Sequence, residues 1–189
     1  MIHLLRQHIQ TRLGNDVSGL EDVLTTFKER HIKRGELVVR QGENCDHVYY
    51  IASGCLQVFV YDADVNETTR DIVIEDNWCA DLISFGGSQP ATENIKAVEP
   101  CILLAINRAD FYHLMQTVPQ FDKVYRQILE ASYANSVYRI NTFVSLSALD
   151  RIKWLMDYRP KLMSRLSSKL IASYLGISQE TFSRLKAKI

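Results

Sequence analysis

The end of the chain, SSKLIASYLGISQETFSRLKAKI from Ser167 to Ile189, restricts the fold more than any other stretch. Ala172 provides a small side chain where two short helices can cross, and Gly176 tolerates the positive φ that a tight turn between them needs. Ser178 is a favourable N-cap for a second helix that begins at Gln179. The positions that would face inward are all apolar: Ile171, Leu175, Ile177, Phe182 and Leu185. Together these constraints predict a helix-turn-helix.

The second helix of this motif is a candidate reader of DNA sequence, because such a helix enters the major groove with its N-terminal residues against the base edges. Arg184 suits guanine O6 and N7, Glu180 suits cytosine N4, and Gln179 suits adenine. The remaining residues predicted to contact DNA from this helix and its cap are Ser178, Thr181 and Ser183. Phosphate contacts are expected from the residues that open the first helix and from the last lysines: Ser167, Ser168, Lys169, Lys186 and Lys188.

The charge distribution favours a polyanionic partner for this end of the chain. The protein has 22 Lys and Arg against 22 Asp and Glu, so it is neutral overall. From Lys161 onward, six basic residues stand against Glu180 alone, which gives this part a net charge of +5 and the remainder −5. Such an asymmetry predicts that the basic part binds double-stranded DNA.

Residues 32 to about 106 have a different pattern, in which short apolar runs are separated by glycines. Every second residue of one run is aliphatic, since Leu56, Val58 and Val60 alternate with Gln57, Phe59 and Tyr61. TRDIVIE and AVEPCILLAI are further strand candidates. Many short strands at this spacing predict an antiparallel barrel or jelly roll. Gly54 is expected at a turn with a positive φ.

Helical periodicity flanks the strand-rich region on both sides. Residues 1 to about 30 are predicted to be helical, with Ser18 as an N-cap and Glu21 completing a capping box. A long helix is predicted from Pro119 to Val144, and another from Ala148 to Tyr158. The long helix has an apolar face that favours packing against a second copy, with covering of the barrel as the alternative: Val137, Ile140 and Val144.

These elements predict an α+β fold with an effector domain at 1–118, a dimerisation helix at 119–145 and a helix-turn-helix domain at 146–189. Their order and sizes resemble the cAMP receptor/FNR (Crp/Fnr) family of bacterial transcription regulators. The resemblance rests on KRGELVVRQGENCDHVYYIASGCLQVFV, CADLISFGG, ALDRI and IASYLGISQETFSRLK. It implies a jelly roll like a cyclic nucleotide-binding domain, a homodimer on a two-fold symmetric site with half-sites about 34 Å apart, and RNA polymerase as a further partner.

The effector cassette departs from the pattern of the cAMP-binding members. In those proteins a Gly-Glu-Leu segment binds the ribose, and an Arg-Ser/Thr pair binds the cyclic phosphate. Here the corresponding residues are Ala80-Asp81-Leu82 and Ala91-Thr92, so the guanidinium is replaced by a methyl group. Thr92 and nearby backbone amides remain candidates for anion binding, and Ser136 of the long helix remains a candidate pocket residue. The predicted effector pocket therefore comprises Asp81, Leu82, Ala91, Thr92 and Ser136, and cAMP is not expected to bind in the usual way; an unidentified small effector, or none, is expected.

The chain ends at Ile189, where family members usually continue into a β-hairpin wing. Without a full wing fewer phosphates are contacted, which predicts weaker and less salt-sensitive DNA binding. The alternative function is a ligand-sensing module whose helix-turn-helix is only structural. Absence of sequence-selective retardation in a mobility shift would favour that alternative.

Catalysis is not expected from the motifs. No Gly-x-Ser-x-Gly, phosphate loop or catalytic carboxylate pair stands out. A cupin-like metal site would need clustered histidines, yet no two are spaced as HxH: His3, His8, His31, His47 and His113.

The remaining features predict a cytoplasmic protein without membrane contact. No apolar run approaches the roughly 20 residues that span a bilayer, and the N-terminal segment MIHLLRQHIQTRLG has no signal-peptide apolar region. The cysteines match no metal or redox spacing and are expected as reduced thiols in or near the core: Cys45, Cys55, Cys79 and Cys101.

Overall fold

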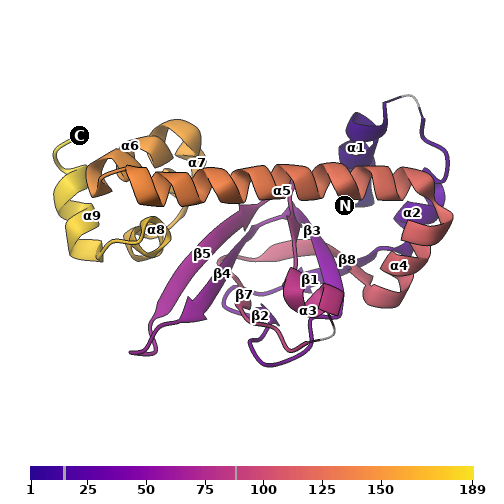
Figure 1. Ribbon diagram of the computed structural model, residues 1–189, viewed down its shortest axis with the longest axis horizontal. Helices are drawn as coiled ribbons and strands as arrows, with labels where there is room; N and C mark the ends of the chain where they lie inside the picture. Colours follow the sequence, from indigo (N-terminus) through magenta and orange to yellow (C-terminus); the bar gives the residue numbers. More distant parts are fainter. Residues whose placement is uncertain (15, 88) are drawn as a thin grey trace. The chain divides into compact units, whose positions relative to one another are not determined.

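The computed structural model describes residues 1–14, 16–87 and 89–189 (Figure 1). The chain forms two compact units. The first, which we call the barrel unit, comprises Met1–Val60 and Ile72–Glu130. The second, the helical unit, comprises Tyr61–Asp71 and Ala131–Ile189, so it contains the tip of a hairpin as well as the C-terminal helices.

Two four-stranded sheets form the predicted jelly roll. Sheet A has the order β1 (Lys28–Ile32), β8 (Cys101–Asn107), β3 (His47–Ser53) and β6 (Trp78–Cys79), and its pairs are antiparallel. Sheet B has the order β2 (Leu37–Val39), β7 (Asn94–Ala97), β4 (Cys55–Tyr61) and β5 (Glu67–Ile74). Gly54 connects β3 to β4 with φ 103°, and a Cβ there would lie 2.8 Å from the Cα of Cys101, so the turn requires glycine.

The helices of the barrel unit begin and end differently from the prediction at the N-terminus. The first thirty residues contain α1 (Ile2–Leu13) and α2 (Leu20–Thr26), and strand β1 already begins at Lys28. The predicted cap at Ser18 was wrong, because Gly19 with φ 74° precedes α2 and the Ser18 hydroxyl donates to Asp16 instead. The other helices that lie at least partly in this unit are α3 (Leu82–Gly87), α4 (Arg108–Thr117) and α5 (Pro119–Ser145).

The C-terminal helices follow the predicted pattern closely. Helix α6 (Ala148–Tyr158) has the predicted bounds, and Ser147 caps it by accepting a hydrogen bond from the Asp150 N–H. Helix α7 (Pro160–Arg165) begins at a proline, whose missing N–H is not needed in the first turn. Helices α8 (Ser168–Leu175) and α9 (Gln179–Lys186) complete the chain.

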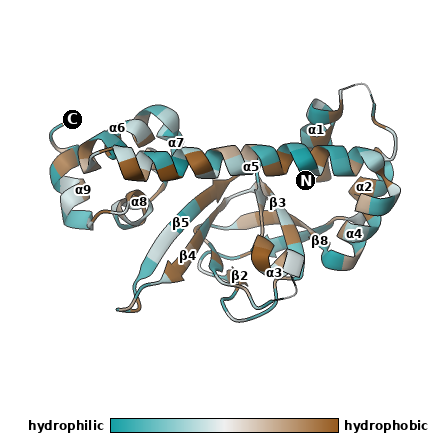
Figure 2. Ribbon diagram, viewed as in Figure 1, coloured by the Kyte–Doolittle hydropathy of each residue, from teal (hydrophilic) through white to brown (hydrophobic). Residues whose placement is uncertain are grey.

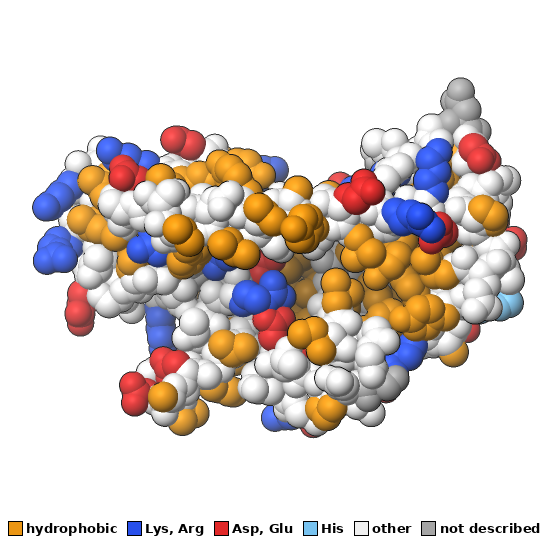
Figure 3. Space-filling view, in the orientation of Figure 1, with side chains coloured by type: hydrophobic (Ala, Val, Ile, Leu, Met, Phe, Trp, Pro, Cys, Tyr) orange, Lys and Arg blue, Asp and Glu red, His pale blue; other side chains and the backbone are white. Residues whose placement is uncertain are grey.

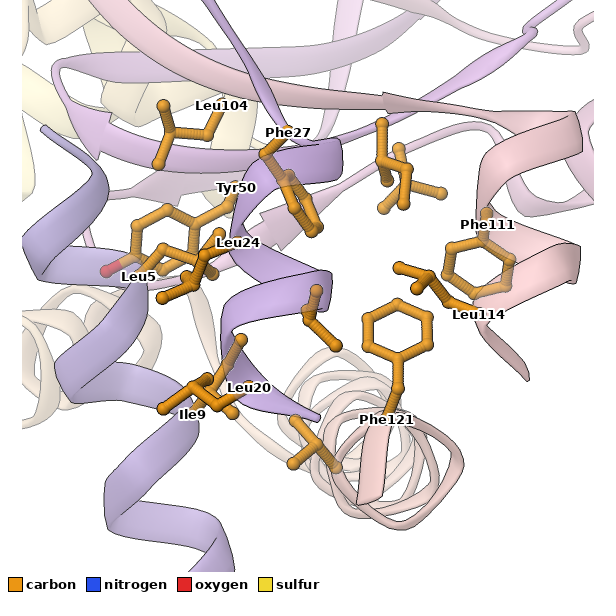
Figure 4. Close-up of a cluster of buried hydrophobic side chains, with 14 of the residues drawn as sticks. Leu5, Ile9, Leu20, Leu24, Phe27, Tyr50, Leu104, Phe111, Leu114 and Phe121 are labelled. Atoms are coloured by element: carbon orange, nitrogen blue, oxygen red, sulfur yellow. The ribbon is translucent and has the colours of Figure 1, made fainter. Parts of the chain in front are cut away.

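Two hydrophobic cores hold the barrel unit together. One lies on the inner faces of the sheets and includes Tyr49, Leu56, Leu103 and Ala105. The other joins sheet A to the surrounding helices, and Figure 4 shows its side chains pointing toward one another: Leu5, Ile9, Leu20, Leu24, Phe27, Tyr50, Leu104, Phe111, Leu114 and Phe121. Full burial of each large side chain contributes about 1.5–3 kcal/mol.

Strand β4 does not have the simple alternation of burial that its sequence suggests. Gln57 and Phe59 are as buried as Leu56 and Val58, with at most 4% exposure. Strand β4 lies between β7 and β5 in sheet B, and the Lys96 ammonium of β7 covers the Phe59 ring at 4.8 Å from its centre.

Helix α1 is fastened to sheet A through a buried histidine. The Trp78 indole N–H donates to His8 Nε2 at 2.8 Å, and His8 Nδ1 lies 2.6 Å from Asp76 Oδ1. An indole only donates, so Nε2 is the unprotonated nitrogen and Nδ1–H donates to the carboxylate. Burial lowers the pKa of His8, mainly by desolvation and against the effect of Asp76. The imidazole is therefore neutral, and its tautomer is fixed by the hydrogen bonds.

Candidate nucleic-acid interface and effector cassette

The turn between α8 and α9 has the geometry that the sequence predicts. Gly176 has φ 65° and ψ 39°, the left-handed conformation of a helix C-terminal cap. A Cβ at this position would lie 2.7 Å from Cε1 of Phe143, so both the backbone and the packing require glycine. Two residues later the Ser178 hydroxyl accepts from the Thr181 N–H at 3.1 Å and so caps α9.

The inner faces of the two helices are buried in part as predicted. Ile171, Leu175 and Phe182 are each at most 2% exposed, as is Ala172 at the crossing, whereas Ile177 and Leu185 are half-buried. The C-terminal end of α8 is held by Arg151, which donates from Nη1 to the Leu175 carbonyl at 2.7 Å. The motif is thus a packed unit, which gives the outward side chains of α9 a rigid base.

The outward face of α9 is polar and accessible. Gln179, Glu180, Ser183 and Arg184 are exposed. Figure 3 shows Lys and Arg side chains over the C-terminal helices at the left of the view. The Ser178 and Thr181 hydroxyls, by contrast, lie 3.0 Å from each other within the cap, so their first role is to hold the end of the helix.

The predicted phosphate contacts lie at the helix ends. Ser167 caps α8 by accepting from the Leu170 N–H, and Ser168 and Lys169 beside it are exposed. Lys186 is exposed with Nζ 5.8 Å from the Phe182 ring centre, and Lys188 is exposed beyond the helix. These cations have the accessibility that contacts to a phosphate backbone need.

Sequence reasoning missed a contact between α8 and the β4–β5 hairpin tip, within the helical unit. The Ser173 hydroxyl lies 3.0 Å from the Glu67 carbonyl and 2.9 Å from Thr69 Oγ1, and it accepts from the Thr69 N–H at 2.9 Å. Arg139 of α5 donates to the Tyr174 carbonyl at 2.9 Å and lies 3.9 Å from the Tyr174 ring centre. No local signal could have revealed this contact, because residues 69 and 173 are 104 positions apart.

In the effector cassette the Asp81 carboxylate is the main acceptor. It is 2% exposed. Its Oδ1 accepts from the Ser84 N–H at 2.9 Å, and its Oδ2 accepts from the N–H groups of Thr92 at 2.7 Å and Glu93 at 3.1 Å. The Thr92 hydroxyl adds a fourth hydrogen bond at 3.2 Å. The backbone amides predicted to bind the anion of an effector therefore already donate to the Asp81 carboxylate.

The other predicted pocket residues differ in their surroundings. Ala91 is 3% exposed and belongs to the core between the sheets, with its N–H bonded to the Glu43 carbonyl at 2.7 Å. Leu82 is 48% exposed. Ser136, in the helical unit, is exposed and bonded to the Ser132 carbonyl of its own helix. Within the barrel unit, Asp81 and Thr92 of the set are in direct hydrogen-bond contact.

Two further properties bear on the class of protein. Within the described ranges, no cluster of three or more His, Cys, Asp or Glu has the arrangement of a metal site, and no helix has the length and hydropathy of a membrane span. All four cysteines are buried, and they form no disulfide with one another. The jelly roll, the long helix and the helix-turn-helix, in this order along the chain, have the architecture of Crp/Fnr regulators.

Comparisons with known proteins agree with this architecture. Residues 29–118 match the family model of the cyclic nucleotide-binding domain. The transcriptional activator protein Anr of Pseudomonas protegens is 24% identical over 186 residues, covering 90% of this chain and 72% of Anr. The structure of the c-di-GMP-responsive regulator CLP of Xanthomonas campestris has a TM-score of 0.75 at 21% identity, covering 92% of this chain and 91% of CLP.

A second kind of relative matches the barrel alone. The patatin-like phospholipase domain-containing protein 6 of Pongo abelii is 26% identical over 89 residues, which are 47% of this chain and 6% of that protein. The chain thus spans only a small part of some relatives and most of others. Residues 29–118 thus match the cyclic nucleotide-binding domain, and the fold is similar to that of CLP and of the catabolite activator protein of Thermus thermophilus, whose structures cover 92% and 96% of this chain.

Proposed function

We propose that this protein is a dimeric, sequence-specific DNA-binding transcription regulator whose effector domain does not bind cAMP in the usual way. The observation that carries the proposal is the exposed face of α9, where Gln179, Glu180 and Arg184 project from a buried base. These are side chains that discriminate base edges in the major groove. Anr, which is named a transcriptional activator, matches 90% of the chain.

Dimerisation through α5 is supported by its exposed apolar side chains. Tyr133, Val137, Ile140 and Val144 are 73%, 39%, 60% and 82% exposed. Their spacing alternates between four and three residues, the repeat of a coiled-coil seam. Figure 2 shows hydrophobic positions recurring along this helix. A second copy of α5 would bury the seam and place two recognition helices on one duplex, where RNA polymerase is a further expected partner.

Loss of ordinary cAMP binding is supported by the cassette. The methyl group of Ala91 offers no charge for a cyclic phosphate, and Asp81 uses the amides of Thr92 and Glu93. A ligand phosphate would have to displace this carboxylate and would meet no compensating guanidinium.

The DNA-binding proposal is tested by selecting bound duplexes from a random pool and then measuring affinities by fluorescence anisotropy over a range of salt. The parent is expected to enrich a two-fold symmetric sequence. Arg184→Ala should lose about 1–3 kcal/mol of discrimination at one position of each half-site. Lys153→Ala, which removes an exposed cation of α6, is the matched control and should keep the selectivity. Binding without sequence preference in the parent would leave the ligand-sensing module as the better description.

A further inference from the structure

Sheet A carries a small basic hollow that the DNA-binding function does not use. Its volume is about 100 Å³, and it is lined by Thr26, Lys28, Arg30, His47, Ala105 and Asn107. Lys28 pairs with Ala105 in the β1–β8 register, and His47 pairs with Asn107 in the β3–β8 register. Paired residues project from the same face of a sheet. The side chains of Lys28, Arg30 and His47 therefore converge over Ala105, whose methyl group leaves space.

The charges around the hollow are of one sign. The Lys28 ammonium makes no hydrogen bond or ion pair with any residue that the structure describes. Arg30 Nη2 lies 3.4 Å from His47 Nε2, and no carboxylate lines the hollow. Asp46, beside His47, is paired with Arg108 at 3.3 Å. Glu29 alternates with Lys28 and Arg30 along β1 and so projects from the opposite face, where it contacts His31 at 2.9 Å.

The protonation of His47 responds to these neighbours. Burial lowers its pKa first, and the charges of Arg30 and Lys28 lower it further, while Asp46 acts in the opposite direction. The imidazole is therefore neutral near pH 7, with Nε2 toward the guanidinium. An anion held between the cations would reverse the balance, since a nearby negative charge favours the protonated ring.

We propose that this hollow is a binding site for a tetrahedral oxyanion, a phosphate or sulfate group, held by Lys28, Arg30 and protonated His47. Pockets for drug-sized ligands have volumes of about 300–1,000 Å³, so a hollow of about 100 Å³ admits the oxyanion but not the body of a larger molecule. Binding takes up a proton on His47, so affinity for an anion of fixed charge increases as the pH falls. The inference stands apart from DNA binding, because it concerns the barrel unit alone.

The test is an NMR titration of the full chain in which the histidine Cε1–H signals are followed at constant ionic strength. Inorganic phosphate should shift the His47 signal saturably and raise its pKa, while the exposed His31 on the opposite face keeps its own. The variant Lys28→Gln/Arg30→Gln should bind phosphate about tenfold more weakly. The matched variant Lys33→Gln/Arg34→Gln, which removes two exposed cations next along the chain, should bind as the parent does.

A second probe separates two sources of the anion. If 5′-AMP binds as tightly as inorganic phosphate, the site takes the terminal phosphate of a larger molecule; if AMP is excluded, the site takes the free oxyanion. His47→Gln should remove the pH dependence but leave weakened binding. The proposal is overturned if phosphate gives no saturable shift, or if both double variants lose affinity equally, because the effect is then general charge screening.

Discussion

The carboxylate of Asp81 gives the sharpest test of how the effector cassette is held. Asp81→Ala removes the acceptor of the N–H groups of Ser84, Thr92 and Glu93 and of the Thr92 hydroxyl. Hydrogen bonds to a charged group contribute about 1.5–3 kcal/mol each. Thr92 is exposed, so water replaces part of the loss. We expect the free energy of unfolding to fall by about 3–5 kcal/mol, a large fraction of the 5–15 kcal/mol of a typical domain.

The assay is urea denaturation followed by circular dichroism and by tryptophan fluorescence. Asp81→Asn keeps the shape of the side chain but offers one acceptor oxygen, so it should lose about half as much stability. Glu130→Gln removes an exposed carboxylate of α5 and is the control for net charge; it should stay within about 0.5 kcal/mol of the parent.

Anion rescue distinguishes an occupied anion site from ordinary packing. In Asp81→Ala the freed amides face a vacated space, so acetate or phosphate should restore stability by RT ln(1 + [L]/Kd). The same anions should have little effect at this site in the parent, because its own carboxylate occupies the amides. An Asp81→Ala variant within about 0.5 kcal/mol of the parent would refute the reasoning. If Asp81→Ala is destabilised but no anion restores its stability, the freed amides do not form an anion-binding site, and that part of the reasoning is refuted.

Further predictions concern α5, the turn between α8 and α9, and the buried histidine His8. Val144→Glu should convert the dimer to a monomer in light scattering and leave the circular dichroism unchanged. Val144 is exposed in the single chain, so the new charge would be buried only in an interface between two copies. Gly176→Ala should lower the free energy of unfolding by about 2–4 kcal/mol, since a left-handed alanine is strained and its Cβ would displace Phe143. The lowered pKa of His8 means that the unfolded chain binds more protons just below pH 6.5, so stability should fall as the pH drops through that range. His8→Gln should flatten this dependence in urea denaturation.

The helix-turn-helix could be predicted from sequence because its determinants are local. The positive φ of Gly176 and the cap by Ser178 depend on neighbouring residues, and both were correct. The jelly roll also followed from local patterning, although the pattern did not distinguish a central strand such as β4 from an edge strand. The cap at Ser18 failed because Gly19 and Ser18 both suit the start of a helix, and tertiary packing decides between them.

The cassette and the hairpin contact could not be predicted, for a different reason. The partners of Asp81 lie up to 12 positions away, beyond the reach of any helix or turn motif. In the sequence, Asp81 in place of the family's glutamate suggests a weakened contact to a ligand. In the fold, its carboxylate instead accepts hydrogen bonds from the chain's own N–H groups. The contact between Ser173 and Thr69 depends on how α8 is aligned with β5. This alignment cannot be predicted from one sequence, because the two residues are 104 positions apart.

The chain connections restrict how the two units can communicate. Covalently they meet only at Val60–Tyr61 and Asp71–Ile72 in the β4–β5 hairpin and at Glu130–Ala131 in α5. Strand β5 is continuous across the boundary at Asp71–Ile72. Its residues up to Asp71 belong to the helical unit, where Thr69 bonds to Ser173 of α8. Its residues from Ile72 belong to the barrel unit. A change of register in β5 would therefore break hydrogen bonds on the first helix of the DNA-binding motif.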